Sequence, residues 1–348
     1  MKKHKKFVLN FILIGLILAI LLPLYFMGIG YLAGLDYFDE LYANKIITLE
    51  NSKDKNRILI DAGSGTRFSI NARDIEKELG IFTINLGDYA GVPLEYKIPR
   101  LAKTAHKGDL IILPLEYKYY LDDFTTKPVV QSLLSGHYNT YFSYFSLFEK
   151  IKIAYSFSLI DNAQSFKKAK KNLKMLMKDE NFSLKKANLT SIDDLIKTRG
   201  DFDYDEKNFP PGADVKIPCF QYIFRDNFKG KIDERFIKNL KSLQNLSQKT
   251  GAKVVFTYPN VNGKACYDFS ADGGEEFKNF LSDIKILVKS YGFDFIGDYK
   301  DSYFDDPDKY MLDTQYHLNK AGRALRSAQL AKTIGEYIKT QKSNNIKD

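Results

Sequence analysis

The feature that most constrains this chain is a long apolar run near its start. Residues 7–34 are interrupted only by Asn10, Pro23 and a few glycines. As a helix, such a run is long enough to cross a hydrocarbon core of about 30 Å. A cleaved signal peptide would have a shorter apolar region and a small-residue cleavage site, and the "YLAG" at the end of this run fits such a site poorly. The sequence therefore predicts an uncleaved transmembrane anchor.

Charges on the two sides of the anchor predict its orientation. Four lysines lie within residues 1–6, and the carboxylates of Asp36, Asp39 and Glu40 follow the run. Because positively charged flanks stay in the cytoplasm, we expect the N-terminus inside and the rest of the chain outside. In a bacterium this describes a single-pass inner-membrane protein whose main domain is periplasmic or faces outward from the cell membrane.

Beyond the anchor, short apolar runs alternate with amphipathic segments. Strands are expected over residues 57–61, 81–87, 108–117, 252–259 and 293–297. Helices are expected over residues 69–80, up to about 106, through 236–246, through 277–288 and up to about 339. Strands joined by helices of this length form a parallel sheet with right-handed crossovers. The predicted fold class is α/β, a three-layer sandwich with a central parallel sheet of the flavodoxin-like type.

This α/β pattern stops between about residues 121 and 230, where the chain is rich in aromatic residues and lysine. We expect a helical insertion there rather than a separate domain. The predicted organisation is a cytoplasmic tail (1–6), the anchor (7–34), a juxtamembrane linker (35–55), an α/β domain (56–340) that contains the insertion, and a polar tail (341–348).

Lysine is concentrated in residues 165–186, where Leu173, Leu176 and Met177 form a narrow apolar stripe. The formal net charge of the whole chain is +9. A solvated helix face accounts for this pattern, and a face held against anionic lipid or an acidic polysaccharide is the alternative. Nothing in the sequence resembles a nucleic-acid-binding module, so no nucleic acid is expected as a partner.

The chain has two cysteines, Cys219 and Cys266. Outside the cytoplasm they could form a disulfide that stabilises the fold by a few kcal/mol. Two separate buried thiols are the alternative. Two cysteines this far apart do not predict a metal site.

The first expected strand runs into "DAGSGTRFSI", where Ser64 lies between two glycines. The glycines let the backbone turn sharply, and a helix that begins here would offer free N–H groups to a developing oxyanion. Open α/β sheets also place their sites at the carboxyl ends of strands. By itself, a Gly-Ser-Gly sequence is more typical of an ordinary turn. Ser64 therefore becomes a candidate nucleophile only together with a base.

His317 is the candidate base. It follows the last expected strand and lies four residues after Asp313. A neutral imidazole can take the proton of a serine near neutral pH, and a carboxylate can fix the tautomer of that imidazole. We expect no carboxylate at useful spacing beside His106 or His137. A hydrolase with Asp313 and His317 as metal ligands is weakly supported, because no second cluster of such residues accompanies them. No metal or other cofactor is expected.

These segments resemble the SGNH (GDSL-like) hydrolase superfamily over residues 56–340, apart from the insertion. "DAGSGTRFSINA" resembles the first block of the family, which makes Ser64 the nucleophile. "NLGDYAG" resembles the second block, whose glycine donates its N–H to the oxyanion; Gly91 is the first choice for this glycine and Gly87 the second. "DTQYHLNKAGRALRS" resembles the last block, in which His317 is the base and Asp313 its partner.

The sequence departs from the family at three places. Gly63 precedes the serine where the family usually has aspartate. The third block usually offers an asparagine to the oxyanion, whereas this chain has "LPLEY", and the ionised carboxylate of Glu116 cannot donate a hydrogen bond. One such donor is typically worth about 3 to 4 kcal/mol in the transition state. The Asp–His spacing is four instead of the usual three.

The long anchor and "YHLNKAGR" most resemble membrane-anchored bacterial members, which act with membrane-bound O-acyltransferases on cell-surface polysaccharides. This resemblance implies an outward-facing, serine-dependent enzyme that transfers an acyl group. With a sugar hydroxyl as acceptor it would be an O-acetyltransferase, and with water an esterase. The implied partners are a cell-surface polysaccharide or its acyl donor, and a membrane-bound O-acyltransferase. The alternative is a non-catalytic scaffold that binds a glycan or docks such an acyltransferase.

Overall fold

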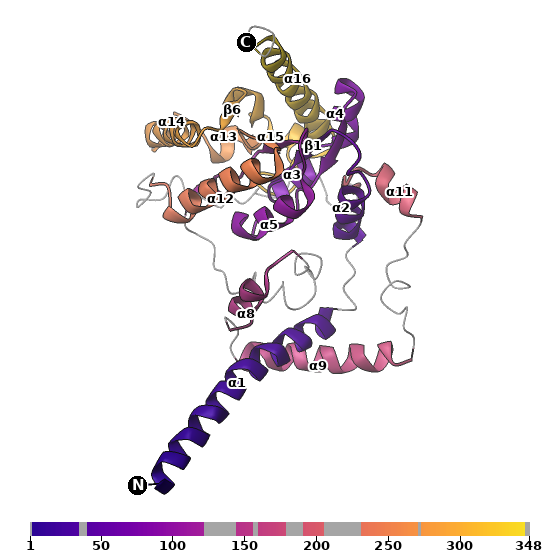
Figure 1. The fold of residues 1–348 in the computed structure, drawn as a ribbon. Helices are drawn as coiled ribbons and strands as arrows, with labels where there is room; N and C mark the ends of the chain where they lie inside the picture. The colour runs from indigo at the N-terminus through magenta and orange to yellow at the C-terminus, as the bar shows by residue number, and fades with distance from the viewer. Residues whose placement is uncertain are drawn as a thin grey trace. The chain divides into compact units, whose positions relative to one another are not determined.

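The computed structural model describes residues 2–34, 40–121, 144–155, 159–178, 191–204, 231–270 and 273–344. The chain divides into two compact units (Figure 1). A helical unit combines Met1–Ala43 with Thr125–Thr190, and an α/β unit combines Asn44–Phe124 with Ser191–Asp348. The division falls inside the expected insertion, because the described residues 191–204 belong to the α/β unit.

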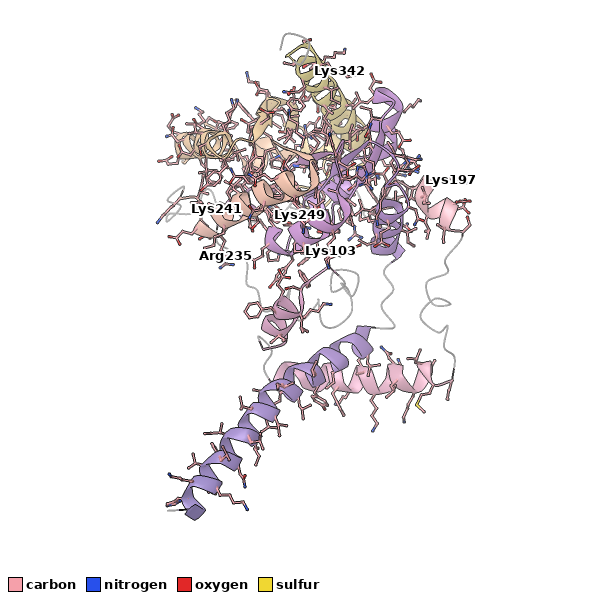
Figure 2. All side chains as sticks on the ribbon, viewed as in Figure 1. Lys103, Lys197, Arg235, Lys241, Lys249 and Lys342 are labelled. Carbon is pink, nitrogen blue, oxygen red and sulfur yellow. The ribbon has the colours of Figure 1, made fainter. Side chains whose placement is uncertain are left out.

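The helical unit is built on helix α1, Lys2–Gly34. Its segment His4–Leu22 is long and apolar enough to span a membrane, and none of that segment is buried in the protein. Its side chains point outward all around the helix axis (Figure 2). Helices α8, Leu147–Tyr155, and α9, Leu159–Leu176, both contact α1.

The α/β unit contains a five-stranded sheet in which every strand pair is parallel. The strand order is β2 (Phe82–Asn85), β1 (Arg57–Ile60), β3 (Leu110–Leu113), β4 (Lys253–Thr257) and β6 (Asp294–Ile296). The predicted α/β class with a central parallel sheet is therefore confirmed. This order places a topological switch point between β1 and β3, and ligands of doubly wound sheets bind at such points.

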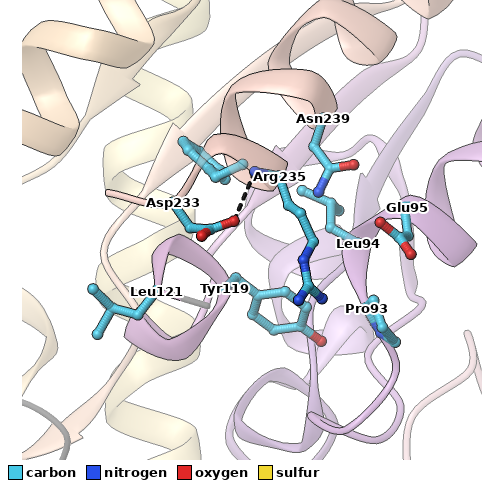
Figure 3. Close-up of a pocket in the computed structure, with 9 residues that line it drawn as sticks. Pro93, Leu94, Glu95, Tyr119, Leu121, Asp233, Arg235 and Asn239 are labelled. Carbon is cyan, nitrogen blue, oxygen red and sulfur yellow. Dashed lines mark hydrogen bonds between the residues drawn. The ribbon is translucent and has the colours of Figure 1, made fainter. Parts of the chain in front are cut away.

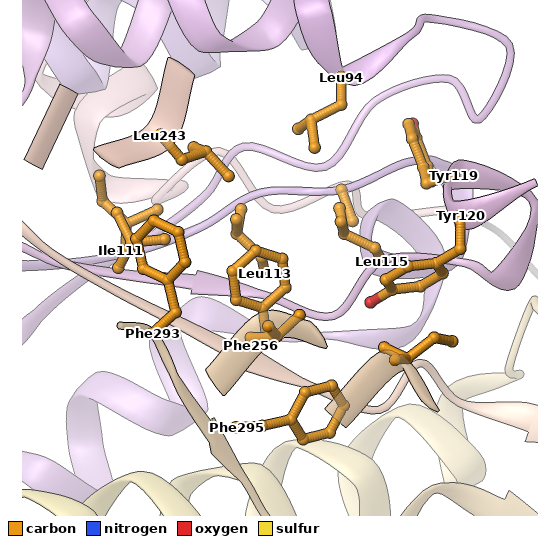
Figure 4. Close-up of a cluster of buried hydrophobic side chains, with 14 of the residues drawn as sticks. Leu94, Ile111, Leu113, Leu115, Tyr119, Tyr120, Leu243, Phe256, Phe293 and Phe295 are labelled. Carbon is orange, nitrogen blue, oxygen red and sulfur yellow. The ribbon is translucent and has the colours of Figure 1, made fainter. Parts of the chain in front are cut away.

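Both faces of the sheet are apolar, and helices cover each of them. Helices α5 (Leu94–Thr104), α12 (Glu234–Thr250) and α14 (Gly274–Ser290) pack on one face, and helices α4 (Ala72–Leu79) and α16 (Lys320–Asn344) on the other. Leu113 and Phe256 point into the first layer, which is rich in aromatic side chains (Figure 4). Ile112 and Val255, their neighbours along the strands, point into the second. Burial on both sides explains why these strands read as continuous apolar runs.

The helix predicted over residues 69–80 corresponds to α4, whose start was predicted three residues too early, and the short helix before it was not predicted. Helix α3 spans Ser64–Ser69, and α4 begins only at Ala72. Asn71 lies between them in an extended conformation, and its side chain accepts the N–H groups of Arg73 and Asp74 as the N-cap of α4. A residue with this capping function interrupts the helix because its own backbone is not helical.

The remaining described elements are short or peripheral. They are α2 (Glu40–Glu50), η1 (Tyr117–Tyr120), α11 (Ile192–Lys197), β5 (Val261–Asn262), α13 (Gly263–Cys266), η3 (Tyr299–Ser302), β7 (Tyr303–Phe304) and α15 (Pro307–Tyr310). Strands β5 and β7 pair in a second, two-stranded parallel sheet that the sequence did not predict. Cys266, in α13, is buried and disulfide-bonded. The only other cysteine of the chain, Cys219, lies outside the described residues.

Candidate active site

Ser64 is the first residue of α3, just beyond the carboxyl end of β1 and therefore beside the switch point. Its N-cap, Gly63, has no side chain with which to cap the helix. The side chain of Ser64 is half-buried. The first N–H groups of a helix have no partner within the helix, so they must be satisfied by other groups.

A buried glutamate satisfies two of these N–H groups. Glu116, after β3, accepts the N–H of Gly63 at 3.0 Å and the N–H of Gly65 at 2.8 Å, one with each carboxylate oxygen. Its side chain is completely buried, and this burial raises the pKa of Glu116 while the two N–H groups act in the opposite direction. Glu116 therefore fixes the backbone on both sides of Ser64 and leaves the N–H of Ser64 between the two bonded amides.

Close packing explains why glycine precedes the serine. A Cβ atom on Gly63 would lie 2.5 Å from Cα of Ala90 and 2.6 Å from a carboxylate oxygen of Glu116. No side chain fits there, so the aspartate that is usual in the resembled family is sterically excluded. The same close approach places the loop that contains Gly91 directly against the start of α3.

The two candidate glycines of this loop differ in what their N–H groups do. The N–H of Gly87 donates to the side-chain oxygen of Asn85 at 2.9 Å, so it is already bonded. The N–H groups of Gly91 and Ser64 form no hydrogen bond with any residue that the structure describes. Of the two candidate glycines, Gly91 is therefore the one whose N–H group has no partner among the described residues.

A small loop brings His317 and Asp313 together. An antiparallel bridge joins Met311 and Leu318, and the N–H of Leu312 donates to the carbonyl of His317 at 2.9 Å. Within this loop, Nδ1 of His317 lies 2.7 Å from a carboxylate oxygen of Asp313. The spacing of four residues is thus compatible with a direct contact. With Nδ1–H directed at Asp313, the lone pair of the imidazole is on Nε2.

The His317 loop lies against the helix that begins with Ser64. The imidazole of His317 stacks on the ring of Phe68, with ring centroids 4.3 Å apart. Phe68 is four residues after Ser64 on α3, so the two side chains share one face of that helix. His317 therefore lies on the Ser64 side of α3. In this conformation no hydrogen bond joins Ser64 to His317, and Nε2 of His317 is bonded to no other residue in the described part of the chain.

Ser69 fixes this contact between distant segments. Its hydroxyl accepts the N–H of Leu318 at 3.0 Å and donates to the carbonyl of Tyr316, also at 3.0 Å. The side-chain amide of Asn260, after β4, donates to the same hydroxyl at 3.0 Å. Both residues that flank His317 are thereby attached to the end of α3. Sequence reasoning missed Ser69 and Asn260, because their hydrogen bonds join segments that are far apart in the sequence.

Buried ion pairs lie beneath the site. Arg100 contacts the carboxylate of Asp61 at 2.6 Å, and Lys97 forms an ion pair with Asp88; all four side chains are fully buried. Burial raises the pKa of Asp61, and Arg100 opposes this effect. Lys97 and Arg100 were also missed, although two basic residues on the apolar side of an amphipathic helix are a signal for buried ion pairs.

Two further features bear on the expectations from sequence. The expectation that His106 lacks a nearby carboxylate is wrong, since its Nε2 lies 3.6 Å from Asp109. Asp109 is committed to a buried ion pair with Arg57 at 2.6 Å, away from Ser64 in the fold. His137 lies outside the described residues. Among the described residues, no group of three or more histidine, cysteine, aspartate or glutamate side chains could hold a metal ion.

A small surface pocket lies elsewhere on the α/β unit (Figure 3). Residues of α5, η1 and α12 line it, among them Glu95, Tyr119 and Arg235. None of Ser64, Asp313 and His317 lines this pocket. We therefore place the candidate active site by the side-chain contacts at the switch point and not by this cavity.

The sequence matches no protein-family model and no curated protein.

Proposed function

We propose that this protein is a membrane-anchored, SGNH-like enzyme that transfers acyl groups through Ser64. One observation carries the proposal: the His317–Asp313 pair is held against the face of α3 that Ser64 begins. The imidazole and the carboxylate thus lie on the side of α3 where the hydroxyl of Ser64 begins the helix, beside the switch point of the sheet. These are the three groups that serine-dependent acyl transfer requires.

In the first half of the reaction, the Ser64 hydroxyl attacks the carbonyl carbon of an acyl ester. Nε2 of His317 takes the hydroxyl proton, and Asp313 stabilises the resulting imidazolium. The N–H groups of Ser64 and Gly91 bind the oxyanion. Collapse of the intermediate breaks the ester bond, and His317 returns the proton to the leaving alcohol. The Ser64–His317 hydrogen bond forms when substrate binds, as catalytic hydrogen bonds often tighten only in the complex.

In the second half, an acceptor hydroxyl gives its proton to His317 and attacks the acyl-enzyme. The bond between the acyl group and Ser64 then breaks, and His317 returns the proton to the Ser64 oxygen. A sugar hydroxyl yields an O-acylated glycan, and water yields a carboxylic acid. We favour transfer to a cell-surface polysaccharide, because helix α1 is long and apolar enough to attach the protein to the membrane from which such polymers are exported. The α/β unit then faces away from the cytoplasm, and a membrane-bound O-acyltransferase is the natural source of the acyl donor.

The test is labelling of the full-length protein by a fluorophosphonate, followed by identification of the modified peptide. Wild type should be labelled at Ser64, Ser64→Ala should not react, and His317→Ala should react much more slowly. Ser290→Ala, which removes an exposed hydroxyl at the end of α14, is the matched control and should be labelled like wild type. A folded wild type that does not react contradicts the assignment of Ser64.

One observation favours a non-catalytic scaffold as the second candidate. Glu116 occupies the N–H groups of Gly63 and Gly65, so the position of the expected third oxyanion donor holds an acceptor. A scaffold would bind the glycan or dock the acyltransferase without using His317. Glycan acylation in cells that express His317→Ala separates the two candidates. Acylation at the wild-type level supports the scaffold, and its loss supports the enzyme.

A further inference from the structure

Helix α9 is attached to the far end of the membrane-spanning helix. The side-chain amide of Asn172 donates to the carbonyl of Leu32 at 2.9 Å, and Ala169 packs on Ile29. Both helices belong to the helical unit, and α9 crosses the C-terminal part of α1 (Figure 1). The position of α9 along α1 is therefore defined by contacts within one unit.

Simple geometry gives the depth of this crossing. The apolar run begins at Phe7, directly after the lysines. About 20 helical residues, at roughly 1.5 Å each, cross the hydrocarbon core, so the core ends near Phe26. Ile29 and Leu32 then lie roughly 5 to 9 Å beyond it, within or at the outer edge of the headgroup layer. The residues of α9 that contact them lie at the same level.

The exposed part of α9 suits this environment. Phe166 and Leu173, seven residues apart and on one ridge of the helix, are 48% and 41% exposed, and Met177 just beyond the helix is 80% exposed. This ridge lies beside the face that packs on α1. The other exposed side carries four lysines, Lys167, Lys170, Lys171 and Lys174. An apolar stripe bordered by lysines is typical of helices that lie in the plane of a membrane surface.

These four lysines lie within eight residues of one another. Exposed basic residues also lie on helices of the α/β unit, among them Lys241 and Lys249 on α12 and Lys342 on α16 (Figure 2). Lys167, Lys170, Lys171 and Lys174 occupy two successive turns and form no ion pair with any residue that the structure describes. Their charge is available to anions outside the protein.

We propose that α9 lies on the membrane surface where α1 emerges, with Phe166, Leu173 and Met177 inserted among the lipids and the four lysines bound to anionic headgroups. This inference rests on the proposed anchor. It extends that proposal by giving the protein a second, lipid-selective membrane contact. The apolar ridge supplies the insertion, and the lysines supply the preference for anionic lipid.

Because the chain contains no tryptophan, the test can use single tryptophan probes in the full-length protein. Leu173→Trp is reconstituted in phosphatidylcholine vesicles with and without phosphatidylglycerol, and its fluorescence is quenched by lipids brominated at defined depths. Ile14→Trp in the apolar segment and Ile286→Trp, exposed on α14, are the controls. We expect deep quenching of Ile14→Trp, shallow quenching of Leu173→Trp in anionic vesicles, and none of Ile286→Trp.

The lysines are tested in the Leu173→Trp background by changing all four to glutamine. Each lysine near an anionic surface contributes about 1 kcal/mol, so association of α9 with the surface should fall by roughly three orders of magnitude and shallow quenching should be lost. Unquenched Ile14→Trp would refute the anchor itself. If Ile14→Trp is quenched and Leu173→Trp is not, the surface contact is refuted. It is also refuted if Ile14→Trp is quenched and the fluorescence of Leu173→Trp responds only to an added acidic polysaccharide. Equal quenching with and without phosphatidylglycerol refutes the role of the lysines.

Discussion

The two units of this protein use charged side chains in opposite ways. Beneath the candidate active site, Asp61 and Arg100 are fully buried and paired with each other, and Glu116 is buried against two backbone N–H groups. On α9, Lys167, Lys170, Lys171 and Lys174 are exposed and have no carboxylate partner among the described residues. In the first region the charges act within the protein, and in the second they face outward.

This difference shows what each region requires. A buried charge is costly unless its partners are well placed, so the groups around Ser64 hold one another in a single arrangement. Exposed charges contribute little to folding, so a cluster of them can serve a contact outside the protein without a cost in stability. Substitutions should therefore have large effects on folding in the first region and almost none in the second.

The largest expected effect is that of Glu116→Ala. The variant leaves the N–H groups of Gly63 and Gly65 buried without an acceptor, at about 1 to 3 kcal/mol each. We expect the free energy of unfolding to fall by about 4 kcal/mol, measured by chemical denaturation, with loss of fluorophosphonate labelling at Ser64. Glu78→Ala, at an exposed position of α4, is the control and should change the free energy by less than about 0.5 kcal/mol. Equal changes in the free energy of unfolding for the two variants would show that Glu116 does not stabilise the backbone around Ser64.

The sequence predicted most of the sheet and, in the candidate site, the pairing of Asp313 with His317. Continuous apolar runs predicted the five parallel strands, because burial on both faces leaves a pattern within each run. The pair of Asp313 and His317 was also predictable, since both lie in one short loop. Features that depend on a few neighbouring residues can be predicted without knowledge of the rest of the fold.

The function of Glu116 could not be predicted in this way. From the sequence it was only a departure from a familiar motif, and its two bonds to Gly63 and Gly65 cross more than 50 residues of chain. The attachment of Leu318 to Ser69 spans nearly the whole α/β unit, with a sequence separation of 249 residues. Such contacts depend on the packing of several elements, so no local sequence pattern predicts them.

Ser69→Ala should have the next largest effect. The change leaves the buried N–H of Leu318 without an acceptor, which costs about 1 to 3 kcal/mol. Because both neighbours of His317 lose an attachment, the rate of Ser64 labelling should fall even where the variant is fully folded. Ser290→Ala is again the control and should alter neither quantity. A Ser69→Ala protein that is destabilised but labelled at the wild-type rate would limit Ser69 to a structural role.

A pH-dependent effect is expected at Lys45. This lysine is buried and donates to the carbonyls of Asn85 and Gly200, and burial lowers its pKa from 10.5 to about 7. Between these two pH values, Lys45 binds more protons in the unfolded chain than in the folded one. The free-energy cost of burying the charged lysine is therefore fully present below pH 7 and disappears as the pH rises toward 10.5.

The measurement at Lys45 is the difference in unfolding free energy between Lys45→Met and wild type as a function of pH. Loss of the two hydrogen bonds affects this difference equally at every pH, so only its slope reports the pKa. Relative to the variant, the free energy of unfolding of the wild type should rise by at most roughly 1.4 kcal/mol for each pH unit above 7. A difference that stays constant from pH 6 to pH 10 would mean that Lys45 remains charged in the folded protein.

The smallest effect on folding is expected for the four lysines of α9, and this result would sharpen the comparison most. Changing Lys167, Lys170, Lys171 and Lys174 together to glutamine should alter the free energy of unfolding in detergent by less than about 0.5 kcal/mol, because all four are exposed. The matched single change, Lys97→Gln, removes one buried charge and the ion pair between Lys97 and Asp88, at a cost of about 3 to 5 kcal/mol. One buried lysine should thus outweigh four exposed ones in folding, while only the four affect quenching by anionic lipid. If the fourfold variant unfolds as readily as Lys97→Gln, the lysines of α9 contribute to the folded structure, and the contrast between the two regions is wrong.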